Sequence, residues 1–131
     1  MKKTYTVILA LCVLIISACE IDGSKPCIEE KPAAAILSDF PDSLKAGDTY
    51  DLEIKFVLEN SCGEFERFDV SNDEMSFDVK LMTKYEGCNC NLEFTEEVTT
   101  YKIDLDFPGV YEFNFWQSDQ DFDTRTVHIY P

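Results

Sequence analysis

Strict alternation of apolar and polar residues from residue 50 onward constrains the fold more than any other feature. In YDLEIKFVLE, from residue 50, one set of alternate positions holds Tyr50, Leu52 and Ile54, and the other holds Asp51 and Glu53. Successive side chains of a strand point to opposite faces, so this pattern predicts a strand with one buried and one wet face, as in antiparallel sheets. The same alternation recurs in FDVKLMTKY (77–85), YKIDLDF (101–107), VYEFNFW (110–116) and TVHIY (126–130).

Two further stretches, AAAILSD (33–39) and EFERFDV (64–70), bring the number of expected short strands to about seven. Turn residues such as Gly47 and Pro108-Gly109 separate them, and no helical period is found after the leader. About seven short strands in about a hundred residues are typical of a β-sandwich. We therefore expect one all-β domain over residues 33–131.

The N-terminus has the layout of a secretory signal peptide. Lys2 and Lys3 precede an apolar run over residues 5–18 that ends in small residues. The run is too short to span a membrane as a helix, which takes about 20 apolar residues. The sequence therefore predicts an exported chain whose signal peptide, residues 1–18, is removed.

The end of this leader, Ile16-Ser17-Ala18-Cys19, resembles the lipobox of bacterial lipoproteins. The resemblance implies cleavage before Cys19, lipidation of its sulfur and anchoring in a membrane. An ordinary signal peptide with an incidental cysteine is the alternative, and it also leads to export. Polar residues 19–32, with two prolines, are expected to form the lipidated tether. Because Glu20 is not the aspartate that often retains lipoproteins at the inner membrane, we favour the outer membrane, with the domain facing the periplasm or the surface.

The charge of the chain limits its partners. The formal net charge is -15, and loss of Lys2 and Lys3 with the leader moves it to -17. Such a surface repels nucleic acid and anionic headgroups, which excludes nucleic acid as a partner. It suits solubility, cations or a basic partner.

Four cysteines remain after Cys12 leaves with the leader and Cys19 takes the lipid: Cys27, Cys62, Cys88 and Cys90. An even number in a small exported domain predicts two disulfides. Zinc or redox sites usually show Cys-x-x-Cys spacing, which is absent here. Cys88 and Cys90 are too close in sequence to bridge each other without strain, so each is expected to have a different partner.

The stretch DFPGVYEF resembles the tyrosine corner of immunoglobulin-like domains through Asp106, Gly109 and Tyr111. The resemblance implies a seven-stranded antiparallel immunoglobulin-like sandwich in which the Tyr111 hydroxyl bonds back across the preceding turn. The chain departs from antibody domains because Phe113 replaces a core cysteine, and Phe65 and Phe68 stand where the core tryptophan would be. Bacterial envelope proteins of this broad class mostly bind, space or scaffold.

The resemblance also implies where the cysteines meet. In such a sandwich the start of the first strand and the loops holding Cys62 and Cys88-Cys90 share one end. We prefer the pairing Cys62–Cys88 with Cys27–Cys90. The exchanged pairing differs by one residue of reach and stays open.

Two candidate ligand sites stand out. Asp119, Asp121 and Asp123 form a D-x-D-x-D opening of the kind that calcium loops use, but the sixth position lacks glycine and the twelfth is Tyr130. A solvated acidic loop is the favoured interpretation. Trp116 falls opposite the core-facing aromatics and suits either a ligand platform or a structural role at a bulge.

No arrangement of residues indicates catalysis, and calcium is the one cofactor considered. The sequence therefore predicts a non-catalytic, lipid-anchored binding or accessory module of the cell envelope, with a protein or glycan partner. The alternative is a small calcium- or carbohydrate-binding lipoprotein that uses the loop at residues 118–124.

Overall fold

The computed structural model describes residues 26–131, so the signal peptide and Cys19 lie outside the described residues. Within that range the chain forms nine β-strands. They are β1 (Ile28–Ala33), β2 (Ile36–Leu37), β3 (Ser43–Lys45), β4 (Thr49–Asn60), β5 (Gly63–Asp73), β6 (Ser76–Glu86), β7 (Leu92–Asp104), β8 (Gly109–Ser118) and β9 (Asp121–Tyr130).

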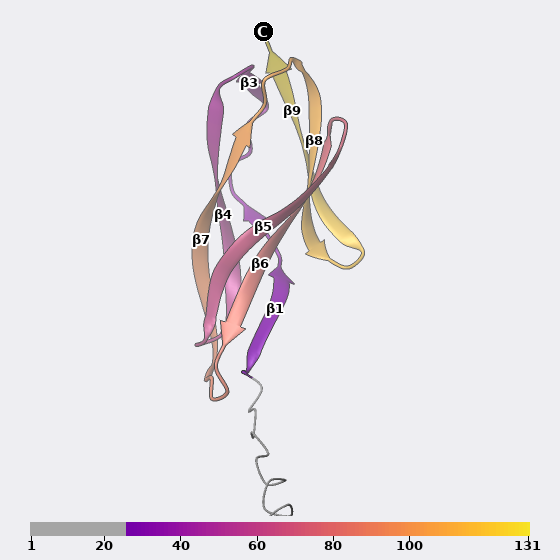
Figure 1. Cartoon of the computed structure of the whole chain (residues 1–131). Helices are drawn as coiled ribbons and strands as arrows, with labels where there is room; N and C mark the ends of the chain where they lie inside the picture. The colour runs from indigo at the N-terminus through magenta and orange to yellow at the C-terminus, as the bar shows by residue number, and fades with distance from the viewer. Residues whose placement is uncertain (1–25) are drawn as a thin grey trace, which may run out of the picture.

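The strands form two facing sheets (Figure 1). Sheet A has six strands: five follow the order β1-β6-β8-β9-β3, and β5 also pairs with β6. Strands β8 and β1 pair with consecutive stretches of β6, residues 76–79 and 81–86, whereas β5 pairs along nearly its whole length. Sheet B has three, in the order β2-β4-β7. The predicted all-β sandwich is confirmed. Strand β1 begins at one end of the molecule, and the C-terminus lies at the opposite end (Figure 1).

The core lies between the sheets, where the alternating residues of β4 meet those of β8. Leu52, Ile54 and Phe56 are fully buried on β4, and they pack in one cluster with Phe113 and Phe115 of β8. Burial of each such side chain contributes roughly 1.5–3 kcal/mol. The Phe77 and Phe113 rings stack with centroids 4.9 Å apart, so aromatic packing adds to the apolar burial.

The count of seven strands was too low. Strand β1 occupies residues that we expected to belong to the tether, and it pairs along β6 from Ile28↔Glu86 to Ala33↔Leu81. The sequence did not predict β1 as a strand because it contains three charged residues and Pro32. Proline is tolerated here because β1 is an edge strand, where one side of the backbone needs no ladder partner. Strand β3 is too short to show any period.

The expected fully antiparallel arrangement is also wrong in two places. Strands β6 and β8 are parallel over Ser76–Val79, and β3 and β9 are parallel over Ser43–Lys45. Parallel neighbours require a crossover connection. Strand β7, which lies in the opposite sheet, provides that crossover between β6 and β8.

The tyrosine corner is confirmed as a hydrogen bond. The Tyr111 hydroxyl donates to the Phe107 carbonyl oxygen at 3.0 Å, across the turn between β7 and β8. The ring of Tyr111 is buried. This bond closes the end of the sandwich opposite the cysteines.

Candidate binding surface

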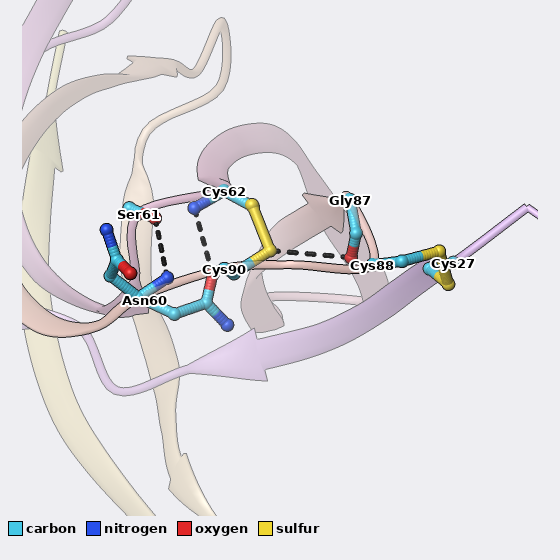
Figure 2. The surroundings of a disulfide bond; sticks show 8 residues. Cys27, Asn60, Ser61, Cys62, Gly87, Cys88 and Cys90 are labelled. Carbon is cyan, nitrogen blue, oxygen red and sulfur yellow. Dashed lines mark hydrogen bonds between the residues drawn. A yellow bond between two sulfur atoms is a disulfide. The ribbon is translucent and has the colours of Figure 1, made fainter.

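Two disulfides join three segments at the end of the sandwich where β1 begins (Figures 1 and 2). Cys27 bonds to Cys88 and Cys62 bonds to Cys90, with Cα atoms 5.1 Å and 5.6 Å apart. The expectation that Cys88 and Cys90 have different partners is confirmed, but our preferred pairing was wrong. The two bonds are typical of an oxidising, extracytosolic setting.

Strand register explains the pairing. Ile28 pairs with Glu86, and the Gly87 N–H donates to the Cys27 carbonyl oxygen at 2.9 Å. Cys27 therefore lies beside the end of β6, where Cys88 is the first cysteine to follow. Cys90 lies further along the loop and meets Cys62 in the turn between β4 and β5. Because the sequence did not predict β1, it could not place Cys27 beside β6.

Gly87 allows the two disulfides to sit this close together. Its φ of +152° is rare for residues with a side chain, and a Cβ atom there would lie 2.7 Å from Cys62 Sγ (Figure 2). The Cys90 sulfur lies 3.4 Å from the Gly87 carbonyl oxygen. Any larger residue at position 87 would push the Cys62–Cys90 bond out of place.

An open hollow of about 350 Å³ lies between β1 of sheet A and β4 of sheet B. On that edge of β4, the short strand β2 pairs only with Ile54 and Lys55. Beyond Lys55 no described strand pairs with this edge, which leaves room for the hollow. Its apolar lining includes Ala33, Ile36, Val57, Phe94 and Trp116.

A β-bulge in β7 opposite Glu59 shapes one end of the hollow. The register between β4 and β7 shifts between Leu58 and Asn60, so that Glu59 alone stands opposite Glu93 and Phe94 and has no paired residue in the ladder. The Glu59 N–H donates instead to the Tyr85 hydroxyl at 3.1 Å. The Glu59 carboxylate pairs with Lys31, whose ammonium lies 4.8 Å from the centroid of the Tyr85 ring. The hydrogen bond to Glu59 raises the pKa of Lys31 above its ordinary value.

Trp116 lines the hollow and is half-buried. A second register shift lies between Trp116 and Ser118, which agrees with the structural role at a bulge predicted for Trp116. Ala35 donates its N–H to the Trp116 carbonyl oxygen at 3.4 Å, and the Gln117 side chain donates to the Ala35 carbonyl oxygen at 2.8 Å. Trp116 thus marks a bulge held by the N-terminal segment, and its side chain also contributes to the hollow.

The outer face of sheet B carries exposed apolar side chains that sequence reasoning missed. Strand β7 begins at Leu92, well before the predicted start at residue 101. In its first half Thr99 and Glu97 pair with the core-facing residues Ile54 and Phe56 of β4. Its apolar residues therefore face outward, and Phe94 is 70% exposed. We call Ile36, Val57, Phe94 and Val98 the sheet B face. The alternation of apolar and polar residues in LEFTEEVT (92–99) could have predicted this part of the strand, although its apolar residues face solvent and not the core.

The three aspartates of the β8–β9 turn do not converge on one point. Asp123 is held by Arg125, whose guanidinium donates to its two oxygens at 2.7 Å and 3.0 Å. Asp119 and Asp121 are exposed beside the turn. In the part of the chain from residue 26 onward, no three His, Cys, Asp or Glu side chains form a group that could hold a metal ion.

The fold and this surface define a disulfide-stapled all-β sandwich with an open apolar hollow at the edge between its sheets. The chain belongs to the ORF11 beta-sandwich domain family, whose model matches residues 52–128, from β4 into β9. No curated protein and no solved structure matches it. Over residues 26–131, no helix has the length and apolar character needed to cross a membrane.

Proposed function

We propose that this protein is a non-catalytic binding module of the bacterial cell envelope, anchored by lipid at Cys19. The single observation that carries the binding role is the sheet B face. Phe94 and Val98 of β7 are 70% and 52% exposed, and they share this face with the exposed Ile36 and Val57. Contiguous exposed apolar side chains next to a hollow are typical of contact surfaces.

The position of the disulfides supports the anchored arrangement. Cys27 is fixed to Cys88 at the end of the sandwich where β1 begins. Residues 19–27 can extend by at most about 29 Å. A lipid on Cys19 would therefore hold the cysteine end towards the bilayer and direct the tyrosine-corner end away from it. The residue after Cys19 favours the outer membrane.

Mass spectrometry and cell fractionation test the lipid anchor. The change Cys19→Ser should remove the lipid mass from the mature protein and move it from the membrane fraction to the soluble fraction. Unmodified Cys19 in the wild-type protein would refute the anchor.

The binding role is tested by a photo-crosslinking residue placed at Phe94 or, as a control, at Phe107. These two side chains are 70% and 73% exposed, but Phe94 lies near the start of β7 and Phe107 lies in the turn that follows its end. A discrete adduct from position 94 alone is expected. Equal labelling from both positions, or none from either, would contradict a contact at the sheet B face.

A carbohydrate ligand is the second candidate, and Trp116 favours it. An aromatic side chain beside polar groups can stack on a sugar ring, and Gln117, Thr83 and Glu59 line the same hollow. A glycan array would separate the two candidates, because Trp116→Ala should abolish a glycan signal while leaving crosslinking at position 94 in place. The calcium version of this candidate would need Asp123 to leave Arg125, and calorimetry with calcium tests it.

A further inference from the structure

Strand β7 presents a long open edge. It runs over 13 residues at the edge of sheet B, and β4 is the one described strand that pairs with it. An unpaired edge of this length exposes backbone N–H and C=O groups that can pair with another strand. Folded proteins usually shorten, cover or charge such edges.

The first half of β7 is exposed on both faces. The side chains from Leu92 to Val98 are all exposed, including Thr95 and Glu97, which face the side of sheet B that elsewhere forms the core. Sheet A therefore leaves both faces of this half of the strand open to solvent. A chain added beside β7 would therefore meet side chains on both faces: Phe94 and Val98 on the outer face, and Glu97 on the inner face.

The charge of this edge selects its occupant. Strand β7 carries Glu93, Glu96, Glu97 and Asp104 against the single base Lys102. Both lysines of β4 and β7 already have acidic partners, in the ion pairs Lys55–Glu96 at 3.2 Å and Lys102–Asp51 at 2.9 Å. Among the described residues Glu93, Glu97 and Asp104 have no ion-pair partner.

We propose that β7 accepts an added strand from a protein partner in which lysine or arginine alternates with apolar residues. The inference rests on the proposed binding function and names the chemistry of the partner. Main-chain hydrogen bonds to the open edge supply affinity, and alternation supplies specificity. The apolar residues of the partner lie beside Phe94 and Val98 on the outer face, and its basic residues lie beside Glu97 on the inner face.

A second copy of this chain fits the edge poorly. Pairing β7 with another β7 would bring two sets of glutamates together, and like charges on adjacent strands are destabilising. The lysine or arginine side chains of a basic strand would instead be attracted to these glutamates. The acidic edge thus discourages self-pairing and favours one class of partner.

Synthetic peptides of about eight residues, near the length of an ordinary strand, test the proposal with the purified full chain. One peptide alternates lysine and valine, a second has the same composition in two blocks, and a third alternates glutamate and valine. We expect binding of the first peptide that weakens with added salt, binding of the second that is at least about tenfold weaker, and none of the third. Equal affinity for the first two would show charge attraction without strand addition and would overturn the proposal.

Matched variants locate the site. Phe94→Ser and Glu97→Lys should each weaken binding of the alternating peptide by about tenfold or more, whereas Phe107→Ser and Glu112→Lys should change it by less than about twofold. Glu112 is exposed on the outer face of sheet A, so it controls for the change in net charge. Equal losses in both sets would place the peptide elsewhere. Melting curves check that each variant is folded.

The remaining outcomes separate the alternatives. A dimer that Phe94→Ser dissociates, or binding to zwitterionic vesicles that the same change abolishes, would assign the edge to a second copy or to a membrane and overturn the proposal. If position 94 crosslinks in cells but no alternating peptide binds, strand addition fails while the binding function stands. If position 94 does not crosslink and the alternating peptide does not bind, strand addition and the binding function are both refuted.

Discussion

The hydroxyl of Tyr111 should stabilise the sandwich through a single hydrogen bond, and the change Tyr111→Phe isolates its effect. The ring stays in place, because it is buried and packs 6.2 Å from the Phe77 ring, measured between centroids. The change removes the bond from the hydroxyl to the Phe107 carbonyl oxygen.

The expected cost follows from the position of the bond. A hydrogen bond makes a net contribution of about 0.5–1.5 kcal/mol to stability, and its loss costs more if the acceptor is left unsatisfied in the interior. Phe107 is exposed at the turn and the hydrogen bond is only partly buried, so we expect water to hydrate the carbonyl after the change. We therefore expect a loss of about 1 kcal/mol in the free energy of unfolding. For a domain of roughly 100 residues this lowers Tm by about 4–8 °C.

Thermal unfolding followed by circular dichroism, with the disulfides intact, measures this loss. Tyr130→Phe is the control, because Tyr130 is 52% exposed and its hydroxyl is accessible to water. A Tm for Tyr111→Phe that matches the control would refute the reasoning that the corner stabilises the turn.

Three further changes test the cysteine end. Gly63→Ala should lower stability by about 1–3 kcal/mol in a urea titration, because the added Cβ would lie 2.6 Å from the ring of Tyr85. Tyr85→Phe should cost about 1–2 kcal/mol in the same assay, since it leaves the Glu59 N–H without its acceptor. Replacing Cys62 and Cys90 together by alanine should cost about 3.5 kcal/mol in the chain-entropy model, and non-reducing peptide mapping of the wild type should recover that pair. Unchanged stability in any of these variants would contradict the packing described for that residue.

The alternating segments predicted the sandwich because a buried face selects apolar residues at every second position. The β4 residues Leu52, Ile54 and Phe56 satisfy that rule and are buried. Strand β1 escaped prediction because it is an edge strand with half of its residues exposed, so burial places little demand on its sequence. The parallel pairing of β6 with β8 depends on which sheet β7 joins, and no local pattern carries that information.

The binding surface was less predictable for a related reason. Trp116 was identified because a large aromatic residue broke the alternation of β8. The sheet B face was missed because no strand was predicted between residues 85 and 101, so Phe94 and Val98 were assigned to no element. In β7 they lie on the outer face, and only the register with β4 shows this. The disulfide pairing depended in the same way on the position of β1 beside β6.

Amide hydrogen exchange along β7 tests the central claim most directly, because it reports the backbone edge itself. In the free protein the first half of β7 should exchange faster than the middle of β4, where Ile54 and Lys55 pair with both β2 and β7. Addition of the alternating lysine–valine peptide should slow exchange over residues 93–99 and leave β9 unchanged. Protection that appears on β9 or β5 instead, with β7 still exchanging as in the free protein, would contradict the account.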